Sequence, residues 1–283
     1  MSARAVSNLA RGGQARSRAT TLSIMFGPGG PIRIIGHRGA AGAAPENTVE
    51  AILHGVQAGS HAIEFDVRRT SCGALILMHD PTVDRTTDGR GAVADLSLAA
   101  LRELDAGHGF TPDGGRTHPF RGRGVRIPTL EEGLEAAGDL PVIIEIKSEP
   151  AGTALADWLD RAGRDRPILV GGFSNRAVRP AARAARWRCA TSDEVRRTVL
   201  WGKFGIRRPL PADVTAAMVP VRWRGVRVIT SRFVRAAHRQ GAGVYAWTVN
   251  RPAEMRRLFG LGVDGLISDF PAVLRRVVEE APA

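Results

Sequence analysis

Short apolar runs alternate with longer amphipathic segments along most of this chain. The apolar runs are typical of buried β-strands, and the segments between them carry apolar positions three and four apart, as helices do. Eight runs are expected to form strands, at residues 32–36, 61–67, 141–146, 168–173, 188–191, 216–221, 243–249 and 265–268. Strands that alternate with helices predict a parallel sheet covered by helices. Eight such units in one chain predict an α/β fold with a closed (β/α)8 TIM barrel.

Several helix ends can be predicted from local signals. Thr129 and Glu132 have the spacing of a capping box, which starts a helix at this point. Phe233, Val234 and Ala237 have helical spacing, and Gly241 is expected to end that helix. Residues 196–214 show neither period, and we expect them to be irregular.

One further apolar run, at 75–78, does not fit the alternation of strands and helices. The segment before it is too short for a crossover helix, so this run is expected to pair antiparallel with the strand at 61–67. With the turn near Ser71 and Cys72, His79 is expected roughly opposite Glu64. Alternation along the strand puts Glu64 and Asp66 on the face toward the barrel mouth.

The chain divides into a tail, a barrel and an insertion. Residues 1–30 are rich in Arg, Ser and Gly, contain no acidic residue and lack the apolar core of a signal peptide, so we expect a disordered tail. Residues 31–283 are expected to form the barrel. Residues 81–127 interrupt its rhythm, and we interpret them as an insertion that caps the site. No run of 18 apolar residues is present, which argues against a membrane span.

Composition adds a strong positive charge. The formal net charge is +12, and only two of the 40 basic residues are lysine. This skew indicates compositional bias more than a polyanionic partner, since no basic cluster is interleaved with stacking aromatics, and we expect no nucleic-acid partner. A second interpretation of the charge is peripheral contact with a membrane, for which Trp201 and Phe204 are the candidate residues. The cysteines Cys72 and Cys189 form no motif, which fits a reducing cytoplasm.

Ionisable side chains stand at the ends of the predicted strands, where a β/α barrel collects its chemistry. The acidic ones are Glu64, Asp66 and Glu145, and carboxylate oxygens are the ligands that Mg²⁺ and Ca²⁺ prefer. Any one of them has a structural explanation too, since Glu145 could simply pair with Lys147. Several charges turned inward without a function would be costly, so we interpret the three acids as a site for one divalent cation.

The basic residues at the same strand ends suit attack on a phosphate ester. Arg38 can bind a phosphate oxygen through its planar fork, and Lys147 adds a point charge. His37 and His79 can act as general base and general acid, each worth roughly 10² to 10⁴ in rate. The pattern therefore predicts metal-dependent cleavage of a phosphodiester bound as a small-molecule substrate.

The motifs that carry these residues are similar to those of one known family. They lie at 35–39, 45–48, 64–67, 78–80, 145–147, 246–250 and 262–269. Together they resemble the glycerophosphodiester phosphodiesterase family, in the same order, over about residues 32–275. The insertion at 81–127 falls where that family has one. Residues 196–228 do not match a known pattern and leave the alcohol specificity open.

The resemblance implies a β/α barrel that hydrolyses glycerophosphodiesters to sn-glycerol 3-phosphate and an alcohol with one divalent cation, Mg²⁺ or Ca²⁺. The roles it implies are metal ligation by Glu64, Asp66 and Glu145, acid–base catalysis by His37 and His79, phosphate contacts by Arg38 and Lys147, and a substrate-side aromatic at Trp247. Glu46 matches a polar residue near the metal. Its alternative role is an acidic residue at a helix start, and Asn47 could be a helix N-cap.

Three other functions remain open from the sequence. A lysophospholipase D or sphingomyelinase D-like activity would use the same fold on acylated substrates and would favour membrane contact. A basic nucleic-acid-binding protein on an inactive barrel would leave the acids and histidines unexplained. A variant of the main reaction would let the hydroxyl of glycerol attack first, through a cyclic phosphate. The sequence indicates neither the oligomeric state nor the preferred alcohol.

Overall fold

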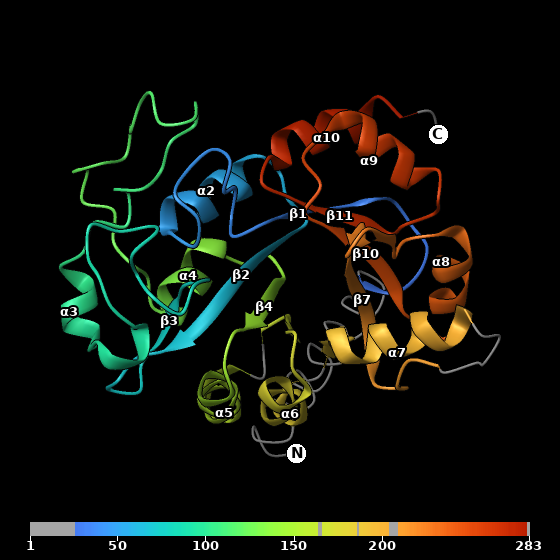
Figure 1. Ribbon diagram of the computed structural model, residues 1–283, viewed down its shortest axis with the longest axis horizontal. Helices are drawn as coiled ribbons and strands as arrows, with labels where there is room; N and C mark the ends of the chain where they lie inside the picture. The colour runs from blue at the N-terminus through green and yellow to red at the C-terminus, as the bar shows by residue number, and fades with distance from the viewer. Residues whose placement is uncertain (1–25, 164–165, 186, 204–208, 282–283) are drawn as a thin grey trace, which may run out of the picture.

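The computed structural model describes residues 26–163, 166–185, 187–203 and 209–281. Eight parallel strands form a closed barrel, because β1 pairs with both β2 and β11 (Figure 1). In barrel order the strands are β1 (Arg33–Gly36), β2 (Ala62–Arg69), β4 (Val142–Ile146), β5 (Ile168–Gly171), β6 (Trp187–Cys189), β7 (Val214–Pro220), β10 (Gly243–Trp247) and β11 (Gly265–Ser268). The predicted TIM barrel is confirmed, and no strand end differs from its predicted position by more than two residues.

Helices cover the outside of the barrel. They are α2 (Val49–Gln57), α4 (Leu130–Ala137), α5 (Glu149–Trp158), α6 (Asn175–Ala184), α7 (Ser192–Lys203), α8 (Ser231–His238), α9 (Pro252–Phe259) and α10 (Pro271–Glu279). A π-helical turn, Leu159–Gly163, continues α5. The capping box of Thr129 and Glu132 is formed at the start of α4. Helix α8 ends at His238, three residues before Gly241, whose φ of 76° suits a left-handed turn. No described helix is long and apolar enough to cross a membrane.

Helix α7 corrects the expected irregularity of residues 196–214, which was wrong for 196–203. Its start is a second capping box: the N–H of Glu194 donates to Thr191 Oγ1 at 3.4 Å, and the N–H of Thr191 donates to Glu194 Oε2 at 2.9 Å. This signal was present in the sequence but was hidden by the strand expected to run through Thr191. Phe204 and the side chain of Trp201, the expected membrane contacts, lie outside the described part of the chain.

The barrel interior is filled with apolar side chains below the site. The interior cluster consists of Phe26, Ile35, Ala62, Ile143, Leu169, Cys189, Ala216, Tyr245 and Ile267. Phe26 packs edge-on against Tyr245, with ring centroids 5.8 Å apart, and both are fully buried. Tyr245 therefore fills the barrel and does not line the pocket. Packing begins at Phe26, within the expected tail; the expected disorder of residues 1–25 lies outside the described residues.

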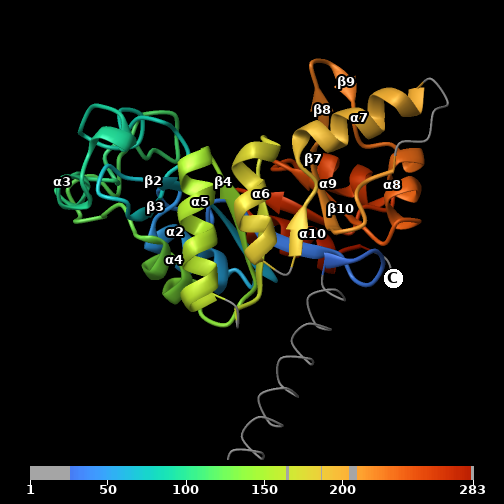
Figure 2. The ribbon, with the colours of Figure 1, turned by 90° about the horizontal axis from the view of Figure 1, so that it is seen from below.

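Strand β3 (Leu75–Leu77) pairs antiparallel with β2, as predicted, with Leu77 opposite Val67. This register, continued by two residues, places His79 opposite Phe65, one residue from its expected position. After the hairpin, the insertion contains a 3₁₀ turn (Val93–Asp95) and helix α3 (Leu98–Arg102). It lies beside β2 and β3, on the opposite side of the barrel from α8 (Figures 1 and 2). A separate apolar core, including Val83, Val93, Leu101, Val125 and Ile127, holds it together.

Candidate active site

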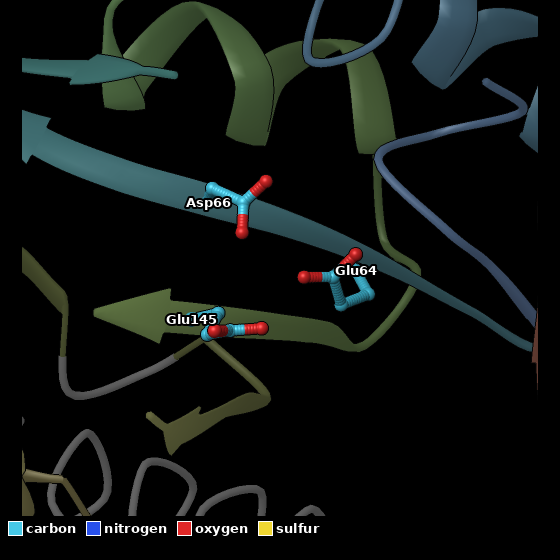
Figure 3. Close-up of side chains that lie close together, drawn as sticks. All are labelled: Glu64, Asp66 and Glu145. Carbon is cyan, nitrogen blue, oxygen red and sulfur yellow. The ribbon is translucent and has the colours of Figure 1, made fainter. Parts of the chain in front are cut away.

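Three carboxylates meet where β2 and β4 run side by side. Asp66 and Glu145 are direct partners in the parallel register, and Glu64 lies two residues earlier on the same face of β2. One ligand atom from each lies within 4.8 Å of the other two (Figure 3). Glu64 and Asp66 are 4% and 1% exposed, so their charges are shielded from water. Parallel pairing of neighbouring strands therefore gathers the three acids that were expected to bind the cation.

Positive groups surround Asp66. Lys147 Nζ lies 2.8 Å from Asp66 Oδ1 and 2.6 Å from Glu145 Oε1, and Arg38 Nε lies 3.2 Å from Asp66 Oδ2. Burial alone would raise the pKa of Asp66, but Lys147 and Arg38 hold that pKa below its usual value. Asn47 is not the expected N-cap. It donates to Asp66 Oδ2 at 2.8 Å and accepts from the Asp66 N–H at 3.0 Å, while Thr48 caps α2.

Glu64 has the opposite environment. Its Oε2 accepts the backbone N–H of Arg38 at 2.9 Å, but Oε1 is buried without a hydrogen-bond partner. Burial, followed by the negative charges of Asp66 and Glu145, raises the pKa of Glu64 to about 7. A divalent cation would supply the missing partner, and an all-oxygen donor set suits a hard ion such as Mg²⁺ or Ca²⁺. The three residues thus fit one metal ion.

The two expected catalytic histidines share one arrangement. His37 follows β1, and its Nδ1 lies 2.6 Å from Oδ1 of Asp269, which follows β11. His79 follows β3, and its Nδ1 lies 2.7 Å from Oδ1 of its neighbour Asp80. A carboxylate can only accept here, so Nδ1 of each ring carries a proton and Nε2 is the atom left for proton transfer. Burial lowers the pKa of His37, but the hydrogen bond to Asp269 and the charge of Glu64 leave that pKa raised.

A single pocket collects these groups. Its polar lining comes from His37, Arg38, Glu64, His79, Glu145 and Lys147, and its apolar lining includes Phe173, Met218 and Trp247. Phe173 is half exposed, and its ring stands edge-on to that of Trp247, with centroids 5.9 Å apart. No residue of the insertion is among those that line this pocket, and its role as a cap stays a prediction. The structure brings together every expected site residue except Glu46.

Glu46 lies behind the pocket and is not one of the clustered acids. Its carboxylate accepts from Arg38 Nη1 at 2.7 Å and from both terminal nitrogens of Arg85 at 2.7 Å. Arg85, which belongs to the insertion, also donates through Nε to Asp80 Oδ2 at 2.5 Å. This bond is the main reason why the pKa of Asp80 is lowered to about 2. Glu46 therefore holds two arginines, one of which contacts Asp66, and its expected place near the metal stays a prediction.

A sequence profile of the glycerophosphoryl diester phosphodiesterase family matches residues 37–273. The chain belongs to this family. The resemblance expected from the motifs is confirmed, and so is the class of phosphoric diester hydrolases.

Individual members of the family align along most of their length. The chain is 28% identical over 255 residues to a glycerophosphodiester phosphodiesterase of Caldanaerobacter subterraneus subsp. tengcongensis, covering 87% of this chain and 98% of that protein. It is 32% identical over 240 residues to the probable glycerophosphodiester phosphodiesterase 2 of Mycobacterium tuberculosis, covering 83% and 85%.

Solved structures of the family share the barrel. A phosphodiesterase of Oleispira antarctica, in complex with the product sn-glycerol-3-phosphate, superimposes with a TM-score of 0.70 at 25% identity, covering 88% of this chain and 97% of the other. The glycerophosphoryl diester phosphodiesterase domain of an uncharacterized Mycobacterium tuberculosis protein gives 0.78 at 23% identity, covering 87% and 99%, and shows the fold alone.

Four residues that surround this phosphodiesterase site were not expected from the sequence. Asp80 and Asp269 stood in the quoted motifs without a role, although β1 and β11 are neighbours in any closed barrel and so bring Asp269 to His37. Phe173 follows directly on β5 and could have been found as an aromatic residue at a strand end. Arg85 had no local signal, because its partner Glu46 is 39 residues away.

Proposed function

We propose that this protein hydrolyses glycerophosphodiesters to sn-glycerol 3-phosphate and an alcohol, with a divalent cation held by Glu64, Asp66 and Glu145. The observation that carries the proposal is the pairing of two carboxylate-bound histidines with three clustered acids in one pocket. The product named for the Oleispira antarctica relative, sn-glycerol-3-phosphate, supports the same reaction.

The phosphodiester binds through its charged oxygens. Arg38 and Lys147 are the cationic side chains of the pocket, and ion pairs with Asp66 hold both in place. Their remaining N–H groups bind the phosphate oxygens. The bound cation would stabilise the negative charge that grows on the phosphate, a contribution of several kcal/mol. Phe173 and Trp247 form an apolar wall for the carbon atoms of the substrate.

The histidines move the protons. His37 Nε2 takes a proton from the attacking water as the water oxygen bonds to phosphorus, and His79 Nε2 gives a proton to the alcohol oxygen as its bond to phosphorus breaks. Atoms balance, since one water is consumed and one proton passes through each ring. Asp269 and Asp80 keep the rings in the required tautomer, as the aspartate does in a catalytic triad.

The first test is release of glycerol 3-phosphate from glycerophosphocholine and glycerophosphoethanolamine, with Mg²⁺, with Ca²⁺ and with EDTA. We expect metal-dependent release that falls by about 10² to 10⁴ in His79→Ala. The matched control is His54→Ala, because His54 is exposed on α2 and away from the pocket. If lysophosphatidylcholine is cleaved and neither diester is, the activity is that of the lysophospholipase D alternative, on acylated substrates.

The assignment of acid and base has its own test. With nitrophenol as the alcohol, the leaving group needs no proton, so the acid variant recovers and the base variant does not. We expect His79→Ala to recover most of its activity on this substrate and His37→Ala to stay inactive. The reverse pattern would mean that the two histidines have exchanged roles. A cyclic phosphate detected during turnover would mean that the glycerol hydroxyl, and not water, is the first nucleophile. The cytoplasmic location stays a prediction, tested by cell fractionation.

A further inference from the structure

A small hairpin rises from the rim of the pocket. Its strands are β8 (Arg222–Trp223) and β9 (Val226–Arg227), and it begins two residues after β7 ends at Pro220. Pro220 is the register partner of Trp247, which lines the pocket. The hairpin therefore stands on the carboxyl-end face of the barrel, on the same side as the site. Figure 2 shows it projecting beyond the strands and helices around it.

The two faces of the hairpin carry different chemistry. Trp223 and Val226 are cross-strand partners and share one face, with 49% and 40% of their surfaces exposed. Arg222 and Arg227 are the other pair and lie on the opposite face. The guanidinium of Arg224, at the turn, lies 4.9 Å from the centre of the Trp223 ring. An exposed apolar pair is thus flanked by three arginines.

Local stability does not explain these arginines. Arg222 stands directly opposite Arg227, and like charges at such positions destabilise a pair of strands. Arg224 and Gly225 form the two-residue turn with φ of 47° and 79°, where the first position favours asparagine or glycine. An isolated hairpin would be more stable with a neutral or acidic residue opposite Arg222 or Arg227. Their presence points to an anionic partner.

No acid of the described chain neutralises the hairpin. Residues 214–241 contain six arginines and no acidic residue. The carboxylate of Glu254 on α9 is close enough for Arg222 and Arg227 to contribute to its lowered pKa, but the main cause is Arg257, whose Nε and Nη2 both bind it at 2.9 Å. None of the three hairpin arginines has an ion pair among the described residues.

We propose that this hairpin docks the pocket face of the barrel on a bilayer that contains anionic phospholipid. The phosphates of such a surface attract arginine, and a tryptophan beside a valine is suited to the boundary between headgroups and acyl chains. A nucleic acid would use the charge but not the exposed apolar pair. The docking itself is independent of turnover, whereas its use rests on the proposed function, since phosphodiesters of lipid origin arise at this surface.

The test is sedimentation of the full chain with vesicles of phosphatidylcholine alone and of three parts phosphatidylcholine to one part phosphatidylglycerol. We expect binding to the anionic vesicles only, and weaker binding as salt is raised. Each arginine near an anionic surface strengthens binding roughly fivefold, so Arg222→Ser with Arg227→Ser should weaken it about 25-fold. Trp223→Ala should weaken it further, and the fluorescence shift of wild type on binding should diminish in that variant.

A matched double variant separates the hairpin from the overall charge. Arg239 and Arg276 are exposed at the ends of α8 and α10, on the far side of the barrel, and Arg239→Ser with Arg276→Ser removes the same charge. We expect this control to bind like wild type. Equal binding by both double variants, no vesicle binding at all, or hairpin-dependent binding of RNA in place of vesicles would each overturn the proposal.

Activity distinguishes failure of this inference from failure of the proposed function. The hairpin variant should cleave soluble glycerophosphocholine like wild type, because neither Arg222 nor Arg227 lines the pocket. Cleavage without vesicle binding would overturn the docking alone. Vesicle binding without cleavage of any glycerophosphodiester would overturn the proposed function and leave the docking in place.

Discussion

Two clusters of buried charge lie on this barrel, and they differ in whether they are complete. At the end of β6, all five N–H groups of Arg188 find acceptors, namely Asp213, Glu194 and the carbonyl oxygen of Cys189. In the pocket, by contrast, Glu64 Oε1 is buried without a hydrogen-bond partner.

Energy explains the difference between the clusters. A buried polar atom without a partner costs about 1–3 kcal/mol, so an unpartnered carboxylate oxygen that lines a pocket points to a cation that binds there. The Arg188 cluster is closed and contributes to folding. The pocket is open at one anionic atom, Glu64 Oε1, which is what a metal ion requires.

The largest effect should come from removing the open carboxylate. Glu64→Gln keeps the shape but removes a metal ligand, and we expect activity to fall about a thousandfold or more, because the cation contributes several kcal/mol. The same change removes repulsion with Asp66 and Glu145, so the melting temperature should stay equal or rise. Calorimetric titration with Mg²⁺ and Ca²⁺ should show weakened binding. A variant that melts well below wild type would mean that Glu64 stabilises the fold, and the pocket would then not differ from the Arg188 cluster.

The closed cluster should respond in the opposite way. Arg188→Met leaves the largely buried Glu194 without its guanidinium, and we expect the free energy of unfolding in urea to fall by about 2 kcal/mol. The kcat of the folded enzyme should not change. Arg196→Met, on the helix that carries Glu194, is the control, since its exposed pair with Asp193 is worth less than about 1 kcal/mol. Equal losses in the two variants would mean that Arg188 is no better placed than a surface arginine.

A smaller effect is expected where the insertion touches the site. Arg85→Ala releases both Asp80 and Glu46, and we expect kcat to fall about tenfold, since the orientation of His79 then relies on Asp80 alone. Arg85 is a positioning residue, so its loss should affect a choline leaving group more than nitrophenol, which needs no acid. Arg90→Ala, in an exposed part of the insertion, is the control. Equal losses on both substrates would indicate general disturbance.

The smallest effect is expected at His61, a neutral side chain whose hydrogen bond is already made within the protein. His61 Nδ1 accepts the backbone N–H of Ile34 at 2.9 Å, and burial, helped by Arg33 and Arg275, lowers the pKa of His61 from 6.5. The unfolded chain therefore binds this proton more readily, so stability is complete above pH 6.5 and declines as pH falls below it. His61→Asn keeps an acceptor that does not titrate. Urea denaturation between neutral and mildly acid pH should show a shallower decline for the variant.

The sequence predicted most of the fold and the centre of the site. Alternating polarity located every barrel strand, and the same alternation turned Glu64 and Asp66 inward. Helix α7 was missed because its capping box, Thr191 with Glu194, overlapped an expected strand. The far contacts could not be read locally: Arg85 reaches Glu46 only because the β3 hairpin returns the chain to the barrel mouth, and Asn47 faces Asp66 only because its backbone turns at a φ of 59°.

Because the insertion has its own apolar core, it forms a structural unit that is attached to the barrel beside β3. The chain leaves the barrel after β3 and returns at Thr129, which forms a bridge with Ile76, so the two junctions adjoin. Residues 81–127 could thus be replaced by another stretch of chain without repacking a barrel strand. Such a replacement would change the contacts of Arg85 with Asp80 and Glu46 and the ion pair of Arg102 with Glu132 on α4. The barrel and the insertion are therefore separate units in which sequence can change, and the ion pairs of Arg85 and Arg102 link them.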